Sequence, residues 1–434
     1  MRRLLACCLA IAAIGAFVPA DAAQAQTPPW FVDEALLPFD AISGGTALWG
    51  VHFDAGYRIE VPANWNGDLV MYAHGYRGTG PVLFVSNPPI RSHLIAEGYA
   101  WAASSYRANG YVPGTGAQDT YRLMRRFSSL VGRPNRVYIT GTSMGGHVTG
   151  VAIERWPDAF DGAQPECGVM GGNDLFDFYQ DAYLLAETLV GDVPEVPTPA
   201  DYFTNPNGWP STRARLGTTF PTGLTPAGER YKAAIEQLTG GDRPTYDAGF
   251  VGPNGGAFIF NFGAAGTGPG RENLDTVYQL DSDPALSAEE VALNDAIPRI
   301  GPDPRDRVER MPAIGLDSPD ITGDIAIPVL STHTLGELFV PFHMQQVYAQ
   351  RVADHGAADL LVTRAIRTVG HCSFSTAERT RAFDDLVNWV ESDLRDRPAG
   401  DDVLNRATVA DPLFGCQFTE PDRPPPGVLA CPEP

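Results

Sequence analysis

The sequence predicts an α/β protein in which a mostly parallel central sheet carries helices on both faces. Three observations lead to this prediction. Short apolar segments of strand length alternate with segments of helical periodicity. The strand segments are apolar on both faces, which is typical of parallel strands buried between two helical layers. The chain has 434 residues, 44% of them hydrophobic, which is enough for a large buried core.

The first run of alternating elements lies between residues 46 and 171. Two paired strands are expected at 46–54 and 57–63, and a buried strand follows at 69–76. The remaining elements are expected in the order helix 90–98, strand 99–107, helix 120–132, strand 136–140, helix 144–156 and strand 160–168.

The alternation stops near Gly171 and resumes near residue 321. The intervening 172–320 is rich in Pro, Gly, Asn and Asp, with scattered helical pieces, one of which opens with the capping box Ser287 to Glu290. The second run contains a strand at 326–334, a helix at 342–356, a strand at 359–369 and a last helix that starts at the capping box Ser375 to Glu378. The predicted organisation is a signal peptide at 1–25, core segments at 26–171 and 321–400, a lid or cap insertion at 172–320 and a Pro-rich tail at 401–434.

The amino terminus has the pattern of a bacterial export signal. Arg2 and Arg3 precede an apolar run from Leu4 to Val18, and Ala23 and Ala25 have the spacing of a cleavage site. The apolar run is shorter than the roughly 20 residues that a membrane span needs. We therefore expect cleavage after Ala25 and a secreted or periplasmic protein.

The charge of the chain disfavours two classes of partner. The full sequence has a net charge of −21, and loss of residues 1–25, which carry one net positive charge, leaves −22. Such a surface repels phosphate backbones and anionic lipids, so neither nucleic acid nor membrane is an expected partner. The sequence leaves the oligomeric state open.

Four cysteines remain after the signal peptide. In an exported protein they suggest two disulfides, with three possible pairings. Cys416 with Cys431 is favoured because both lie in the tail, and Cys167 with Cys372 would then remain. No Cys or His cluster has zinc spacing, and no metal or other cofactor is expected.

The segment GTSMG, residues 141–145, carries the strongest functional signal. It joins a strand directly to a helix, so the serine must adopt a strained backbone, and Gly141 and Gly145 leave room for it. This geometry exposes the Ser143 hydroxyl at the carboxyl edge of the sheet, where the following helix directs its amides. Ser143 is therefore the predicted nucleophile, and the alternative is a tight turn whose serine only caps the helix.

A nucleophilic serine needs a histidine base, and His371 is the predicted one. It follows a strand through Gly370 and precedes the last helix. His147 lies on the helix after the serine and is expected to pack there, and His343 and His355 belong to a helix and its end. His52 and His93 lie early in the chain and have no motif.

The expected acid and oxyanion donors lie in two further loops. Glu337 is the one carboxylate in the loop after strand 326–334, whereas the nearby aspartates precede that strand or end a helix. The oxyanion donors are predicted to be the amides of Met144 and Tyr76, with Gly75 as the alternative to Tyr76. His74 is expected to stabilise its loop. Glu166 and Asp174, near the end of strand 160–168, either face the site or lie on the surface.

These segments resemble the α/β-hydrolase superfamily over about 46–171 and 321–395. The resemblance is carried by HGY at 74–76, GTSMG at 141–145, GELFVP at 336–341 and GHCSF at 370–374. The family usually has aspartate where Glu337 stands. The chain is also similar to secreted bacterial esterases and to polyester or feruloyl-type depolymerases, and SMGG is similar to peptidases of the prolyl-oligopeptidase type.

The resemblance implies a secreted serine esterase that forms an acyl-enzyme on Ser143 and acts on a small or polymeric ester. An exported serine peptidase with the same triad is the alternative, and a non-catalytic binding protein of this fold is a third possibility. The insertion would cover the active site, and its aromatic residues would either line an acyl pocket or form the core of the cap. These residues are Tyr202, Phe203, Trp209, Phe258, Phe260 and Phe262.

Overall fold

The structure is a computed structural model that describes residues 30–432 except 43, 197, 200, 265–271, 302–309, 312–315 and 426. The predicted signal peptide therefore lies outside the described residues. No described helix has both the length and the apolar character that a membrane span requires.

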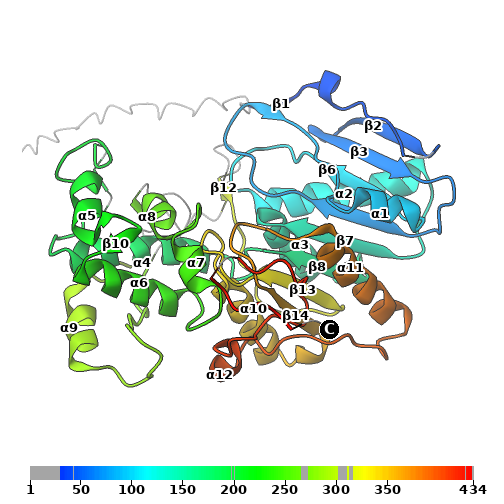
Figure 1. Ribbon diagram of the computed structural model, residues 1–434. Helices are drawn as coiled ribbons and strands as arrows, with labels where there is room; N and C mark the ends of the chain where they lie inside the picture. Colours follow the sequence, from blue (N-terminus) through cyan, green and yellow to red (C-terminus); the bar gives the residue numbers. More distant parts are fainter. Residues whose placement is uncertain are drawn as a thin grey trace, which may run out of the picture.

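An eight-stranded sheet forms the centre of the molecule (Figure 1). Its spatial order is β14-β13-β8-β7-β4-β6-β3-β2, in which β3 is antiparallel to both β6 and β2 and the other neighbouring pairs are parallel. The strands are β2 (Thr46–His52), β3 (Ala55–Val61), β4 (Leu69–Ala73), β6 (Ala100–Ser104), β7 (Val137–Thr142), β8 (Gly162–Glu166), β13 (Val329–Thr334) and β14 (Leu361–Ile366). This confirms the predicted α/β fold class.

Alternate residues of each central strand enter opposite helical layers, because successive strand side chains point to opposite faces. In β4, Leu69 and Met71 join one apolar cluster, whereas Val70 and Tyr72 join another. The first cluster contains side chains of α2 (Pro113–Leu130), α3 (Met144–Arg155) and α10 (His343–Asp354). The second contains those of α1 (Arg91–Ala96) and α11 (Thr376–Glu391). Both faces of the sheet are thus buried, as the apolar strands predict.

Helix α2 begins seven residues earlier than the sequence pattern predicts, at Pro113 instead of residue 120. Its first turn contains Gly114 and Gly116, which are poor helix formers. Tertiary packing explains their presence. A Cβ on Gly114 would come within 2.6 Å of the Asp317 carboxylate, and one on Gly116 within 2.8 Å of Val148.

The chain leaves the sheet after β8, forms a helical lobe beside it, and returns at β13, which pairs with β8 (Figure 1). The lobe has an apolar core that includes Tyr183, Tyr231 and Phe260, and Leu338, Val340 and Met344 from the segment after β13 contribute to the same cluster. Its elements are α4 (Asp174–Leu189), α5 (Trp209–Leu216), β9 (Gly217–Thr219), β10 (Thr222–Leu224), α6 (Pro226–Leu238), α7 (Tyr246–Phe250), α8 (Gly256–Ala264) and α9 (Ala288–Ala296).

The carboxyl-terminal tail packs against the sheet near β14 (Figure 1). The buried Arg367 donates hydrogen bonds to the carbonyls of Pro412, Phe414 and Leu429. The tail contains α12 (Arg406–Val409) and the Cys416–Cys431 disulfide, which is the favoured pairing.

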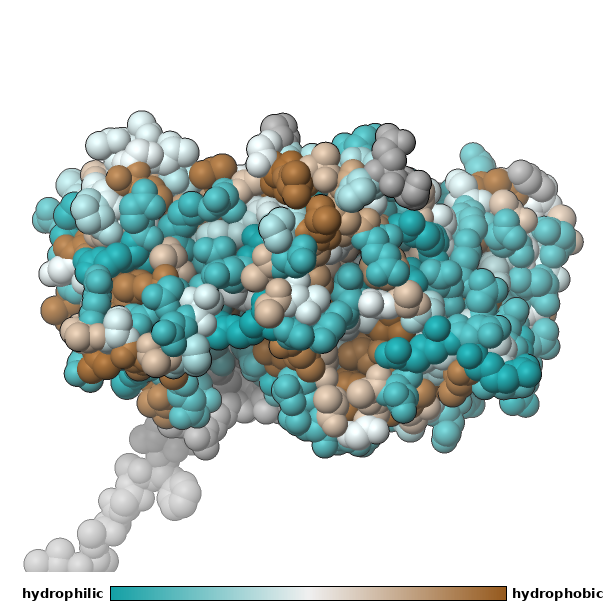
Figure 2. Space-filling model, turned by 60° about the horizontal axis from the view of Figure 1, so that its bottom comes forward, coloured by the Kyte–Doolittle hydropathy of each residue, from teal (hydrophilic) through white to brown (hydrophobic). Residues whose placement is uncertain are grey.

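On the face that Figure 2 shows, hydrophilic residues predominate and hydrophobic residues lie in small separate groups.

Short strand pairs and 3-10 turns complete the described structure. They are β1 (Phe31–Val32) with β5 (Val82–Leu83), β11 (Arg310–Met311) with β12 (Leu316–Asp317), and the 3-10 turns Glu34–Leu36 and Ala358–Leu360. Both predicted capping boxes are confirmed, at Ser287 with Glu290 and at Ser375 with Glu378.

Candidate active site

Ser143 lies alone between the end of β7 and the start of α3. Its backbone has φ 62° and ψ −124°, a conformation that non-glycine residues rarely adopt. The glycines around it permit the turn. A Cβ on Gly141 would lie 2.0 Å from the Gly145 carbonyl oxygen, and one on Gly145 would lie 2.0 Å from that of Ala73. Only glycine fits these two positions, so the sequence places the serine hydroxyl at the carboxyl edge of the sheet.

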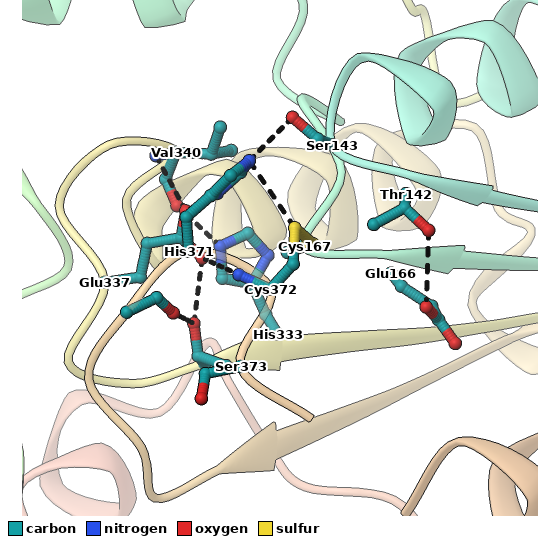
Figure 3. The surroundings of a disulfide bond; sticks show 12 residues. Thr142, Ser143, Glu166, Cys167, His333, Glu337, Val340, His371, Cys372 and Ser373 are labelled. Atoms are coloured by element: carbon teal, nitrogen blue, oxygen red, sulfur yellow. Dashed lines mark hydrogen bonds and ion pairs between the residues drawn. A yellow bond between two sulfur atoms is a disulfide. The ribbon is translucent and has the colours of Figure 1, made fainter. Parts of the chain in front are cut away.

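His371 lies in the loop between β14 and α11, and its ring reaches the serine (Figure 3). The Ser143 hydroxyl donates to His371 Nε2 over 2.7 Å. The other ring nitrogen, Nδ1, is hydrogen-bonded to Glu337 Oε1. Because an ionised carboxylate only accepts, the partners assign the proton to Nδ1 and leave Nε2 free to take the serine proton.

Glu337 is fully buried in the loop after β13 and has several donors. Thr334 Oγ1 donates to its Oε2 over 2.8 Å, and the amides of Val340 and Cys372 donate to the carboxylate over 3.1 and 3.4 Å. Burial raises the pKa of this carboxyl, but electrostatic interaction with His371 and His333 and the hydrogen bonds from His371 and Thr334 together outweigh that effect, so the net pKa lies below its usual value. Glu337 is therefore ionised at neutral pH, as an orienting acid must be.

The predicted oxyanion loop packs against the serine turn. A Cβ on Gly75 would lie 3.1 Å from Ser143 Cβ and 3.0 Å from the Thr142 carbonyl oxygen. Met144 is the first residue of α3, and Tyr76 follows Gly75 directly. His74 contacts the carbonyls of Gly75 and Ser105 and stacks on Tyr106. Burial lowers the pKa of His74 to about 4, so it is neutral and has the loop-holding contacts expected of it.

The other histidines lie outside this arrangement. His147 is buried and contacts the Pro319 carbonyl and the Tyr111 hydroxyl. His343 begins α10, and His355 ends it. His333, on β13, was not singled out from the sequence. Its Nε2 donates to the Val340 carbonyl over 2.7 Å and so holds the loop that carries Glu337.

Three charged side chains near the site correct or extend the sequence interpretation. The sequence leaves Glu166 either facing the site or on the surface, whereas in the structure it is buried and paired with Arg379. Arg379 lies on α11, where the sequence gives no signal for it, because the contact joins residues 213 positions apart. Asp174 forms an ion pair with Arg351 and remains partly exposed.

The Cys167–Cys372 disulfide is also present, and Cys372 directly follows the histidine. Within the described residues, Cys167, His371 and Cys372 form the one group with ligand atoms close enough for a metal ion. The two sulfurs are bonded to each other, so they are not available as thiolate ligands.

The aromatic residues of the insertion have mostly structural positions. Trp209 stacks on the buried Phe260 at 4.1 Å, and Tyr202 packs on both Phe260 and Tyr183. Phe258 differs, since its ring packs against Phe339, which lies edge-on to the His371 ring at 5.0 Å. Phe262 lies where side chains are not described.

Comparison with known proteins gives three kinds of match. The prolyl oligopeptidase family profile matches residues 92–196. The o-phthalyl amidase of Xanthobacter agilis is 23% identical over 421 residues, which cover 82% of this chain and 91% of that protein. An acylaminoacyl peptidase of Pyrococcus horikoshii matches at 12% identity and TM-score 0.40, over 83% of this chain and 44% of that one.

A feruloyl esterase B of Aspergillus oryzae matches at 13% identity and TM-score 0.40, over 82% of each chain. This chain therefore spans less than half of the length of the peptidase structure but most of the esterase and the amidase. The fold assignment rests on the strand order and the position of the serine turn. Together with the acid and the histidine that follow the serine in chain order, these features give the chain an α/β-hydrolase fold, with side chains arranged as in a serine hydrolase.

Proposed function

We propose that this protein hydrolyses carboxylic esters through an acyl-enzyme on Ser143. The observation that carries the proposal is the continuous hydrogen-bonded chain from Ser143 Oγ through His371 to Glu337. A serine hydroxyl becomes nucleophilic when a base takes its proton, and an oriented imidazole with an ionised acid behind it does so.

In the proposed reaction, Ser143 attacks the ester carbonyl as His371 Nε2 takes its proton. The amides of Met144 and of Tyr76 or Gly75 stabilise the oxyanion. His371 then protonates the leaving alcohol, and the Ser143 acyl ester forms. Water, deprotonated by the same imidazole, attacks this ester and releases the acid with the serine restored. The overall reaction consumes one water molecule, and the nucleophile and the base belong to this chain.

The acyl group is proposed to be apolar or aromatic. Phe339 is partly exposed and lies beside His371, with Phe258 and Tyr179 packed against it. A ring in this position offers apolar surface to an acyl group bound at Ser143.

Amide hydrolysis is the second candidate. It is favoured by the similarity to o-phthalyl amidase, which extends over most of both chains. The match to the prolyl oligopeptidase family is the reason to include a peptide among the amide substrates that are tested. The same triad would serve, with His371 protonating a leaving amine instead of an alcohol.

Matched substrates separate the two candidates. Benzoyl and phthalyl p-nitrophenyl esters would be compared with the corresponding p-nitroanilides and with a peptide anilide, using Ser143→Ala as the control. The ester proposal expects kcat/KM to favour esters by more than their intrinsic reactivity does. Anilide turnover above that ratio would establish the amidase instead.

Export is proposed from residues 1–25 and from the two disulfides, which persist in oxidising compartments. Sequencing the amino terminus of protein recovered outside the cytoplasm is expected to give Gln26 as the first residue.

A further inference from the structure

The end of β8 contacts both the nucleophile and the histidine loop. Glu166 and Cys167 are consecutive here. The Glu166 carbonyl accepts the Ser143 amide over 3.0 Å, and the Thr142 hydroxyl donates to the Glu166 carboxylate over 3.5 Å. The backbone and the side chain of Glu166 thus hold the strand end that carries the nucleophile; Figure 3 shows the side-chain contact with Thr142.

Cys372, the residue after the predicted base, is held at three atoms. Its amide donates to Glu337 Oε2 over 3.4 Å, and its carbonyl accepts from Arg379 over 3.0 Å. Its sulfur is bonded to Cys167, across 205 positions of sequence. A residue fixed at its amide, carbonyl and side chain leaves little freedom to the neighbouring His371.

Arg379 joins these two sets of contacts. Its guanidinium pairs with the Glu166 carboxylate and also donates to the Cys372 carbonyl. Both side chains are largely buried. A buried carboxylate is costly unless a charge compensates it, so the pair is held together strongly once the site is folded. The planar, forked guanidinium can contact both partners at once, which a lysine ammonium does less well.

Three residues of this region also have an unusual backbone conformation. Ser143, Cys167 and Cys372 all have positive φ, at 62°, 42° and 55°. Non-glycine residues adopt this region at a cost and keep it where the surroundings enforce it, which is common at functional sites. Here the hydrogen bonds, the ion pair and the disulfide described above hold these residues in that conformation.

We propose that Glu166, Arg379 and the Cys167–Cys372 disulfide form a positioning hub that fixes the His371 ring relative to Ser143. This inference rests on the proposed function, because it assigns a role in aligning the triad. The Cys372 sulfur lies 3.5 Å from His371 Nε2, the atom that takes the serine proton. Glu166 and Arg379 are positioning residues, which act through Ser143, Cys372 and His371. A misplacement of about 1 Å can cost about 100-fold in rate.

The first test compares Arg379→Gln and Arg379→Lys with Arg381→Gln. Arg381 is an exposed arginine on the same helix and donates to the Phe418 carbonyl in the tail. Arg379→Gln is expected to lower kcat by about 10- to 100-fold with little change in KM. Arg379→Lys keeps the charge opposite Glu166 and is expected to recover part of kcat, and Arg381→Gln is expected to keep it.

The second test uses the two disulfides as matched controls. A Cys416→Ser/Cys431→Ser variant retains the Cys167–Cys372 bond alone, and dithiothreitol is expected to lower its kcat reversibly. A Cys167→Ser/Cys372→Ser variant is expected to have a low kcat that the reductant does not change. The downfield proton resonance of His371 Nδ1–H reports directly on the ring, and it is expected to broaden in the reduced protein well below the unfolding temperature.

The outcomes are distinguishable from those of the proposed function. If Ser143→Ala retains wild-type turnover, the catalytic assignment fails whatever the hub does. If Ser143→Ala is inactive but Arg379→Gln and the Cys167→Ser/Cys372→Ser variant keep full kcat and only unfold at lower temperature, the hub is purely structural and the inference is overturned. Should Arg379→Gln not fold, Arg379→Lys and the reversible reduction decide.

Discussion

At the scale of single residues, Glu337 determines how the base is oriented. Its carboxylate accepts the Nδ1 proton of His371 and the Thr334 hydroxyl, and it lies fully buried with its pKa held below the usual value. The longer side chain of glutamate, compared with the usual aspartate, is accommodated because the Val340 and Cys372 amides also hold it.

Replacing Glu337 with Gln is expected to reduce kcat by roughly 10⁴-fold, because the amide can present a donor to Nδ1 and favour the wrong imidazole tautomer. Steady-state kinetics on a p-nitrophenyl ester measures this. Thr322→Ala, which removes an exposed hydroxyl bonded to Glu154, is the control. A loss of less than tenfold in Glu337→Gln would show that another group orients His371.

Phe339 is expected to select the acyl group. Phe339→Ala should lower kcat/KM for a benzoyl ester by about tenfold, since one apolar contact is worth about 1–3 kcal/mol, and should affect an acetyl ester much less. The ratio of the two kcat/KM values is the measurement. An equal loss for both esters would mean that the ring supports His371 and does not contact the acyl group.

The sequence identifies the residues whose positions follow from local rules. Ser143 follows from the glycine pattern, and His371 and Glu337 follow from their loops after predicted strands. Arg379 and His333 could not be found in this way, because their contacts depend on tertiary folding: Arg379 reaches a residue 213 positions away, and His333 lies in an ordinary strand.

At the scale of secondary-structure elements, the central strands and the helices after them were predictable because their periodicity is strong. The start of α2 was not, since Pro113, Gly114 and Gly116 resemble a loop until the packing of Val148 and Asp317 against them is known. Helix α4 also contains a buried carboxylate, Asp181, and the sequence pattern of the helix does not predict this burial.

Asp181 accepts hydrogen bonds from the hydroxyls of Tyr278 and Thr276. Burial raises its pKa to about 7, against an ordinary 3.8, although these hydrogen bonds oppose the shift. The native state therefore binds the proton more tightly than the unfolded state. The stability this gives is full below the ordinary pKa and is lost as pH rises toward about 7.

Asp181→Asn removes this dependence. Between about pH 4.5 and about pH 7.5, the unfolding free energy of the wild type should fall relative to that of the variant by at least about 1 kcal/mol. Urea titrations at both pH values measure the difference. Asp295→Asn, at an exposed position on α9, is the matched control for loss of one negative charge. A pH-independent difference for Asp181→Asn would contradict the shifted pKa.

At the scale of the whole molecule, the chain combines a sheet core, a helical lobe inserted between β8 and β13, and a tail packed on the sheet. The loss of alternation in the sequence signals the insertion, but not the position of its helices relative to the sheet, because that depends on contacts across the fold. Most of the insertion's aromatic residues lie in the apolar core of the lobe, and Tyr179 and Phe258 also pack on Phe339 beside His371.

The tail disulfide is expected to affect stability and not catalysis. Cys416 and Cys431 close a loop of 15 residues, so the Cys416→Ser/Cys431→Ser variant should lose about 3 kcal/mol of unfolding free energy. The tail also contacts the loop after His371, where Arg423 donates to the Ser373 carbonyl over 2.7 Å. The kcat of the variant should nevertheless stay close to that of the wild type, because the hydrogen bonds that join Ser143, His371, Glu337 and Thr334 lie outside the tail. Chemical denaturation and kinetics on the same preparation test both statements; a fall in kcat comparable with that of Cys167→Ser/Cys372→Ser would refute them.

Covalent labelling of Ser143 tests the central claim most directly. The protein would be treated with a fluorophosphonate, digested and mapped by mass spectrometry, with Ser143→Ala and His371→Ala in parallel. The predicted result is one adduct on Ser143, absent from Ser143→Ala and formed at least about 100-fold more slowly in His371→Ala. An adduct on another residue, or full ester turnover by Ser143→Ala, would contradict the assignment of this chain as a hydrolase that uses that serine.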